Sequence, residues 1–380
     1  ENPAPLVIVI PGFQRSKETL SNISIELSRR GIVVIAIDPY AQGGSSSSMS
    51  KRAATKEGYG MFSIVDYVYN TSNLDYIDKK RIGVTGHSAG GLASIRGAQY
   101  FGKEAKKTNT PSKIHSVFVS GMIRMGFEPK NIKNIKSNVG LSYALYDEGA
   151  WQNELKNGDM RRSPEVLRLI NHQLLKEKKL YKSVEIGRFY GDLNHRNLTI
   201  IHNEKVLHPL QPYDHLATKN QIDYFLKVFQ IQDVLSSNSQ VWYWKEFFTL
   251  LSLTLSFLLI IPLSRCLLRI PYFNELKHPV PNLIPNPKGF QKRIFWGVFV
   301  FSALVACFSF IPMSELSKIL FKDASNRIQT WFFPQRMNNA IMLWAIFNGF
   351  IGFMIFFGNY YLFGKSNKVD TRLWGAKISF

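Results

Sequence analysis

The chain has 380 residues, a formal net charge of +20 at pH 7 and apolar side chains at 45% of its positions. This apolar content excludes a disordered chain, and two cysteines in so long a chain exclude a small domain held together by disulfides. Composition changes along the chain, because residues 241–380 hold 20 of the 28 phenylalanines but only five of the 27 acidic residues. The sequence therefore predicts two regions of different character, a globular N-terminal domain and an apolar C-terminal region.

Residues 1–235 alternate short apolar runs with segments of helical spacing. The apolar runs predict strands at Leu6–Ile10, Ile32–Ile37, Arg81–Thr85, Ile114–Ser120, Val139–Tyr146 and Leu198–His202. Helical spacing follows at Ser16–Arg30, Gly58–Tyr69, Ala93–Tyr100, Glu165–Lys179 and Asn220–Phe229. Continuous apolar strands that alternate with helices indicate a mostly parallel sheet with helices on both faces. We expect an α/β domain over residues 1–235, followed by a linker and interfacial aromatic segment at 236–246.

The strongest motif is the run from Gly86 to Gly90, which reads GHSAG and matches G-x-S-x-G between a predicted strand and a predicted helix. In this context the serine occupies a sharp strand-to-helix turn, and the glycines let the helix pack closely against the strand. The hydroxyl of Ser88 is then exposed at the carboxyl edge of the sheet, at the positive end of a helix. The motif predicts Ser88 as a catalytic nucleophile.

Three segments, VIVIPGFQRSKET, GIVVIAIDPYAQGGSS and DYIDKKRIGVTGHSAGG, resemble the α/β-hydrolase superfamily. The most similar branch is that of the dienelactone-hydrolase-like and acetylhydrolase-like esterases. The resemblance covers residues 4–230 and begins at what is usually the third strand. It implies an α/β-hydrolase fold and a serine nucleophile supported by an acid and a histidine, in the chain order Ser, acid, His.

The resemblance implies the acid in a loop after a late strand and the histidine in a loop after the last strand. Asp147 ends the run LSYALY and is the preferred acid, with Glu148 as the alternative. The stretch VLHPLQPYD resembles the histidine loop of the family and favours His208, with His215 as the alternative. Two further histidines, His195 and His202, lie before or within the last predicted strand.

An oxyanion hole needs two backbone N–H donors. One is the amide of Ala89, which follows the nucleophile. By resemblance the other is the amide of Phe13, in the loop after the strand Leu6–Ile10. Relatives often have histidine at the position of Pro11, which supplies no donor needed here. His87 is structural in relatives and receives no catalytic role.

Several partners are not expected. The eight histidines and two cysteines show no spacing typical of a metal site, so the sequence predicts neither a metal nor a cofactor. Basic residues of the N-terminal region are scattered rather than clustered with aromatic residues, which argues against a nucleic-acid partner.

Three long uncharged apolar runs follow the domain, at residues 247–263, 294–311 and 340–363. Each has the length of a membrane-spanning helix, and tryptophans or tyrosines stand near their ends, as in an interfacial belt. We expect three transmembrane helices and a tail at 364–380. The aromatic triplet Trp331–Phe333 predicts an interfacial segment between the second and third helices.

Lysine and arginine counts predict how these helices are oriented. Residues 264–293 carry six basic residues against one acid, and residues 364–380 carry four in a short tail. Both segments are therefore expected in the cytoplasm, with the hydrolase domain outside the cell membrane. An exported domain needs a targeting signal, so we expect a signal or anchor segment before residue 1.

The sequence thus favours a membrane-anchored extracytoplasmic serine hydrolase of the carboxylesterase or lipase-like type, acting on an ester that could be lipid-like. Two alternatives stay open. One is a catalytically inactive hydrolase fold that serves as a binding or assembly module, and the other is an acyltransferase that uses the same triad.

Overall fold

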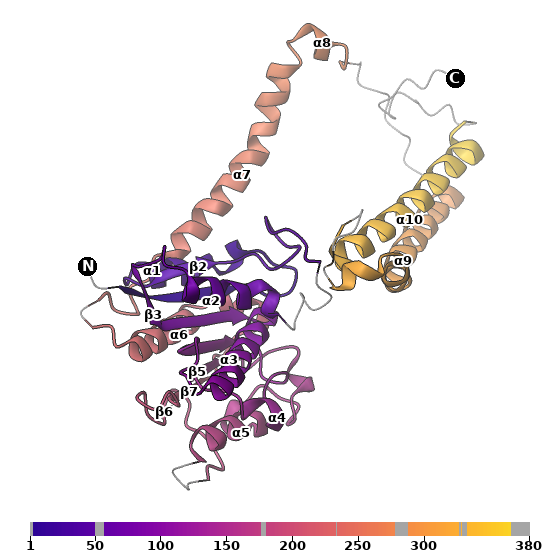
Figure 1. The fold of residues 1–380 in the computed structure, drawn as a ribbon. Coiled ribbons are helices and arrows are strands. Elements are labelled where there is room, and N and C mark those ends of the chain that lie inside the picture. The colour runs from indigo at the N-terminus through magenta and orange to yellow at the C-terminus, as the bar shows by residue number, and fades with distance from the viewer. Residues whose placement is uncertain are drawn as a thin grey trace. The chain divides into compact units, whose positions relative to one another are not determined.

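The computed structural model describes residues 3–49, 57–175, 180–232, 234–277, 288–326, 328 and 333–365. The chain forms two compact units, the first covering Glu1–Glu246 and the second beginning at Phe247 (Figure 1). Trp331 and Phe332 of the predicted interfacial segment, and the tail from residue 366 onward, lie outside the described residues.

A single sheet forms the centre of the first unit. In the described part of the chain it has seven strands, in the order β2-β1-β3-β4-β5-β7-β6. All neighbouring strands are parallel except the pair β6–β7, so the predicted, mostly parallel sheet is confirmed. The strands are β1 (Ala4–Ile10), β2 (Val33–Ala36), β3 (Ile77–His87), β4 (Ser116–Ser120), β5 (Asn138–Ser142), β6 (Phe189–Tyr190) and β7 (Thr199–His202).

Helices cover both faces of this sheet (Figure 1). Side chains of β1 alternate between two apolar clusters: Leu6 and Ile8 pack with helices α2 and α3, whereas Val7 and Val9 pack with α1 and α6. This alternation explains why the strands read as unbroken apolar runs, since both faces are buried. The helices are α1 (Ser21–Ser28), α2 (Met61–Asn70), α3 (Ala89–Thr108), α4 (Pro129–Ile132), α5 (Pro164–Gln173) and α6 (His215–Phe229). Short 3-10 turns are η1 (Lys17–Leu20), η2 (Gly58–Gly60), η3 (Ala150–Gln152), η4 (Met160–Arg162) and η6 (His208–Tyr213).

Several strands are shorter than the sequence indicates, and β5 loses the most residues. β5 ends at Ser142, whereas the apolar run predicts a strand to Tyr146. The residues after Ser142 are no longer part of the strand, but two backbone hydrogen bonds still join them to the segment after β7. Leu145 N–H donates to Glu204 O at 2.7 Å, and Tyr146 N–H donates to Val206 O at 3.2 Å. β6, with only two residues, is too short for a pattern to predict.

The segment after α6 is held against α1 by a buried arginine. The side chain of Arg30 is 0% exposed and donates to the carbonyl oxygens of Leu235, Ser236 and Ser239 at 3.1, 2.5 and 2.9 Å. Its charge is compensated by the Glu26 carboxylate at 2.8 Å, which is equally buried.

Glu26 also caps the start of α7 (Trp242–Leu267) from another element of the fold. Its carboxylate accepts the N–H groups of Val241 at 2.7 Å and Trp242 at 3.1 Å. Burial by itself raises the pKa of Glu26, but the Val241 amide and the guanidinium groups of Arg30 and Arg29 lower it below its usual value. The first turn of α7 therefore belongs to the compact N-terminal unit, where a carboxylate stabilises the helix N-terminus.

The second unit contains helices long and apolar enough to cross a membrane. Three such spans lie in the described residues: Trp242–Leu267, Gly289–Leu320 and Arg336–Leu362, with 26, 32 and 27 residues. The expected apolar helices are thus present as α7, α9 (Gly289–Leu320) and α10 (Arg336–Asn359), with short α8 (Pro271–Asn274), η7 (Lys322–Asn326) and a π-helical turn (Tyr360–Gly364) between or after them. Helices α9 and α10 pair through bonds from Trp344 Nε1 to Ala306 O at 2.8 Å and from Asn348 Nδ2 to Ser309 Oγ at 3.1 Å.

Replacing Arg30 with methionine should destabilise the first unit strongly. The change leaves the Glu26 carboxylate buried without its main partner, and breaking a buried pair from one side costs about 3–5 kcal/mol. The measurement is the Tm of the detergent-solubilised full chain by circular dichroism. Arg188→Met is the matched control, because Arg188 forms an exposed pair with Glu185 and such pairs contribute about 0–1 kcal/mol. Equal Tm values for the two variants would contradict the structural role of Arg30.

Candidate active site

Ser88 stands at the turn between β3 and α3. Its backbone has φ 57° and ψ −117°, a region that few residues other than glycine occupy. Two bonds hold it there: Ser88 N–H donates to Ser120 O at 2.8 Å, and Leu92 N–H donates to Ser88 O at 3.0 Å. A strained serine between a strand and a helix is the arrangement that exposes a nucleophilic hydroxyl.

The flanking glycines are required by contacts with β1. A Cβ atom on Gly90 would lie 2.0 Å from the carbonyl oxygen of Ile10, and a Cβ on Gly86 would lie 2.5 Å from the same oxygen. Both distances are far below van der Waals contact, and both involve backbone that a side chain cannot displace. The motif is therefore a packing requirement at the point where α3 begins.

Asp147 and His208 form a hydrogen-bonded pair. His208 Nδ1 lies 2.8 Å from Asp147 Oδ2, with the carboxylate 6% and the imidazole 21% exposed. Gly149 N–H donates to the second carboxylate oxygen at 2.7 Å. Burial raises the pKa of Asp147, but the His208 hydrogen bond and charge, with the Gly149 amide, lower it below its ordinary value. The carboxylate is thus kept ionised and directed at one nitrogen of the ring.

The loops that carry this pair are joined beneath it by Glu204. This buried carboxylate accepts bonds from Ser142 Oγ at 2.7 Å, Asn220 Nδ2 at 2.8 Å and Gln211 Nε2 at 3.3 Å. Burial raises the pKa of Glu204. Its partners lie on β5, α6 and η6, the turn that begins at His208. Sequence reasoning missed Glu204 and Gln211, because a polar residue after a strand carries no local sign that it is buried.

Gly121 connects the pair to Ser88. It follows Ser120, whose carbonyl accepts the Ser88 N–H. A Cβ on Gly121 would stand 3.0 Å from His208 Cε1 and 2.8 Å from His87 Nε2. The Ser88 turn, the end of β4 and the His208 ring therefore meet at the carboxyl edge of the sheet.

His87 supports the ring of His208 from the side. The two ring centroids are 4.5 Å apart. Burial, together with the charges of His208 and Arg15, lowers the pKa of His87 to about 3. His87 is therefore a neutral packing partner, consistent with the structural role that the resemblance implies.

The other candidate side chains lie elsewhere. Glu148 is exposed, and the carboxylate bonded to His208 is that of Asp147. His195 is exposed and pairs with Asp192, and His215 is exposed as the first residue of α6. His202 is buried at the end of β7, where burial lowers its pKa to about 4. Among the described histidines, His208 forms the hydrogen bond with Asp147, and His195, His202 and His215 do not.

The proposed oxyanion donors lie at the start of α3 and in the loop that follows β1. Ala89 is the first residue of α3, where a helix leaves its N–H groups without intrahelical partners. Phe13 follows Gly12, on which a Cβ would lie 3.5 Å from Ser88 Cβ and 3.4 Å from His87 O. The Phe13 side chain is 52% exposed, so the residue contributes little to the core.

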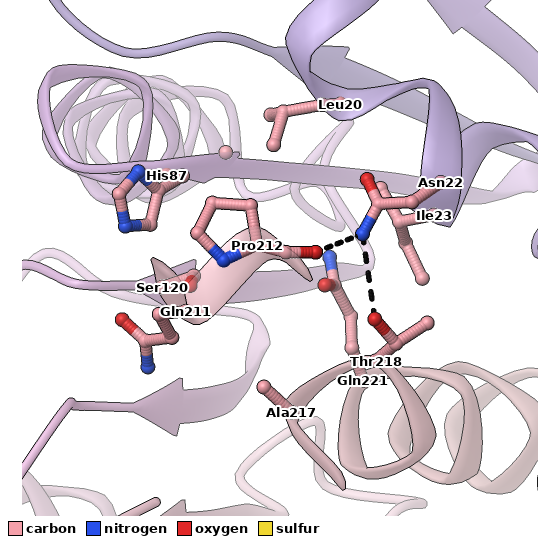
Figure 2. A pocket seen from close by; sticks show the side chains of 11 residues that line it. Leu20, Asn22, Ile23, His87, Ser120, Gln211, Pro212, Ala217, Thr218 and Gln221 are labelled. Atoms are coloured by element: carbon pink, nitrogen blue, oxygen red, sulfur yellow. Dashed lines mark hydrogen bonds between the residues drawn. The ribbon is translucent and has the colours of Figure 1, made fainter. Parts of the chain in front are cut away.

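A small cavity lies behind the site, and Figure 2 shows His87 and Ser120 lining it on the side of the sheet. Across it, Asn22 of α1 donates to Pro212 O of η6 and lies 3.4 Å from Thr218 Oγ1 of α6. The first contact anchors the turn that carries His208 to α1, and the second joins α1 to α6. No group of three or more metal-binding side chains was found among the residues that the structure describes.

Three histidines predict a loss of stability in mild acid: His87 and His202 are buried, and His115 is half-buried. Burial lowers the pKa of His87 to about 3, and of His115 and His202 to about 4, from an ordinary value of 6.5. Below pH 6.5 the unfolded chain binds protons that the folded chain does not, so the free energy of unfolding falls as the pH falls. The loss at pH 5 should be about 2 kcal/mol per histidine.

Denaturant titrations of the detergent-solubilised chain between pH 7.5 and pH 5 measure this effect. In His202→Leu the decrease should be about one third smaller, since one of the three groups no longer titrates. Equal stability at both ends of the pH range would contradict the neutral, buried state of these rings.

A match to a family model agrees with the observed fold. Residues 5–147 match the family model described as alpha/beta hydrolase fold. No match was found among the curated proteins. The matched segment contains β1, β3, the Ser88 turn and Asp147.

Solved structures show distant likenesses. A 2,6-dihydroxy-pseudo-oxynicotine hydrolase is 14% identical over 62% of this chain and 64% of its own, with a TM-score of 0.37. Dipeptidyl peptidase 4 of Porphyromonas gingivalis is 12% identical over 60% and 31%, with a TM-score of 0.39. A dienelactone hydrolase-like promiscuous phosphotriesterase from metagenomic libraries is 12% identical over 61% and 88%, with a TM-score of 0.37. The chain thus spans less than two thirds of the first two structures. The family-model match and the observed sheet establish the α/β-hydrolase fold for the first unit, and this fold supports a hydrolase activity.

Proposed function

We propose that the chain is a membrane-anchored serine hydrolase that cleaves an ester, with Ser88, Asp147 and His208 as its catalytic triad. The observation that carries this proposal is the 2.8 Å bond between Asp147 and His208, made beside a serine in a strained strand-to-helix turn. The chain order Ser, Asp, His is the order of the hydrolase fold.

The chemistry follows from the positions of these groups. Asp147 accepts the Nδ1 proton of His208, so that Nε2 is free to accept the proton of the Ser88 hydroxyl. Ser88 Oγ attacks the ester carbonyl, and the amides of Phe13 and Ala89 stabilise the negative oxygen that forms. His208 returns the proton to the leaving alcohol, which leaves an acyl group on Ser88. Water, activated by His208, then releases the acid and restores the serine.

Two other outcomes remain to be distinguished by experiment. An acyltransferase would form the same acyl-enzyme and pass the acyl group to an acceptor other than water. An inactive binding module would retain the fold without forming the acyl-enzyme. The Asp147–His208 bond favours an active enzyme, because a module that only binds has no need to keep a buried, ionised acid directed at a histidine.

Ser88→Ala should abolish hydrolysis of a small soluble ester, with a loss of about four powers of ten in kcat, since nucleophile and base act as a unit. Fluorophosphonate labelling of the detergent-solubilised chain should disappear in the same variant. His208→Ala should match this loss. His215→Ala is the matched control and should retain activity, because His215 is exposed on α6. More than about a tenth of wild-type activity in Ser88→Ala would exclude the triad.

We further propose that the hydrolase domain lies outside the cell membrane. The basis is the excess of lysine and arginine between the first two spans, which favours a cytoplasmic location for that loop. The domain on the opposite side of α7 is then extracytoplasmic, where a lipid-like ester of the outer leaflet is within its reach.

Thiol labelling on intact cells tests this orientation. The starting chain carries Cys266→Ala and Cys307→Ala, which remove both native thiols. Lys106→Cys, at an exposed position of α3, should react with an impermeant maleimide without permeabilisation. Lys288→Cys should react only after permeabilisation. The reverse pattern would mean that the domain lies in the cytoplasm.

A further inference from the structure

Arg15 carries a positive charge that the described fold does not neutralise. Its side chain is exposed, and among the described residues no carboxylate oxygen lies within 4.0 Å of its guanidinium. Its neighbour Lys17 differs, because it forms an ion pair with Asp38 at 2.6 Å. An arginine held in a loop without a carboxylate partner is available for an anionic ligand.

The backbone of Arg15 is fixed next to the nucleophile. Arg15 N–H donates to Gly12 O at 3.3 Å, and Arg15 O accepts a bond from the buried side chain of Gln42. Gln14, which precedes Arg15 in this loop, has a φ of 57°, in the left-handed region. The loop that contains the Phe13 amide therefore also fixes the backbone position of Arg15.

The side chain of Arg15 lies over the same glycine as Ser88. The point where a Cβ of Gly12 would stand is 3.9 Å from Arg15 Cδ and 3.5 Å from Ser88 Cβ. The methylene stem of Arg15 and the side chain of Ser88 thus both face the same point next to Gly12. The guanidinium charge also reaches His87, where it is the third cause, after burial and His208, of the lowered pKa.

We infer that Arg15 selects substrates that carry an anionic oxygen group, a carboxylate or a phosphate, in addition to the ester that is cleaved. This inference rests on the proposed esterase function and names its substrate class. A guanidinium binds both groups with paired N–H donors, and charge-assisted bonds of this kind are the strong ones. The net charge of +10 on residues 1–240 would also raise the local concentration of an anionic substrate.

Two matched ester pairs test the inference on the full chain in detergent. The first is 4-nitrophenyl hydrogen succinate and its methyl ester, which differ in one carboxylate on the acyl side. The second is 4-acetoxyphenyl phosphate and its dimethyl ester, which differ in the negative charge of the phosphate group on the alcohol side. The quantity compared is the ratio of kcat/KM for the anionic member to kcat/KM for the neutral member of each pair.

In Arg15→Gln this ratio should fall about tenfold for at least one pair, because the variant loses a charge-assisted hydrogen bond to the anionic group. The pair that responds identifies carboxylate or phosphate as the group. Arg15→Lys should give an intermediate ratio, because it keeps the charge and loses the paired geometry. Added NaCl should lower the wild-type ratio.

Lys107→Gln is the control, as it removes one exposed charge from the last turn of α3, at the opposite end of that helix from Ser88. It should leave both ratios unchanged. An unchanged ratio in Arg15→Gln, or an equal fall in Lys107→Gln, would overturn the inference and leave the esterase proposal intact. Failure of the wild-type chain to hydrolyse any of the four esters would overturn both.

Discussion

The candidate site depends on one steric constraint, the contact between the first turn of α3 and the end of β1. Gly90 comes so close to the Ile10 carbonyl that any side chain would collide with backbone. With the first turn of α3 packed against β1, the chain must turn sharply after His87 to enter the helix. Ser88 makes this turn and therefore takes its strained conformation. It also brings the loop that follows Ile10 beside the serine. Ser88, the backbone of Phe13 and the side chain of Arg15 are thus placed by the same contact.

A second constraint acts on the opposite side of the serine. The segments after β5 and β7 continue to pair by single backbone bonds at Leu145 and Tyr146, although neither remains a strand. Glu204 fills the space beneath them and binds side chains from three elements. Asp147 and His208 are carried on these paired segments, so their geometry does not depend on two independent loops. Loops at the carboxyl ends of parallel strands are where open α/β sheets bind their ligands.

Much of the fold could be predicted from local pattern. Apolar runs located six of the strands, because a strand buried on both faces has no polar alternation. The GHSAG run located the Ser88 turn, because the motif can be read from five consecutive residues, although its glycines are required by a contact with Ile10 far earlier in the chain. Asp147 and His208 were predicted from a resemblance rather than from spacing. In the structure His208 Nδ1 lies 2.8 Å from Asp147 Oδ2.

The remaining features depend on contacts between residues far apart in the sequence. Arg30 and Glu26 read as the polar side of an amphipathic helix, yet both are buried against residues about 205 to 216 positions later. Glu204 and Gln211 are likewise polar residues whose burial depends on β5 and α6. Arg15 is a surface arginine by its local sequence, and only the Gly12 contact places it beside Ser88. Such contacts leave no periodicity in the sequence, so pattern analysis cannot detect them.

The covalent acyl-enzyme is the most direct test of the account. The detergent-solubilised chain is mixed with 4-nitrophenyl acetate, quenched in acid within the first turnovers and digested for mass spectrometry. We expect one acetyl group on the peptide that contains Ser88, with a stoichiometry that approaches one at early times. Turnover of the ester with the acetyl group on another residue, or with no covalent adduct while product accumulates, would contradict it.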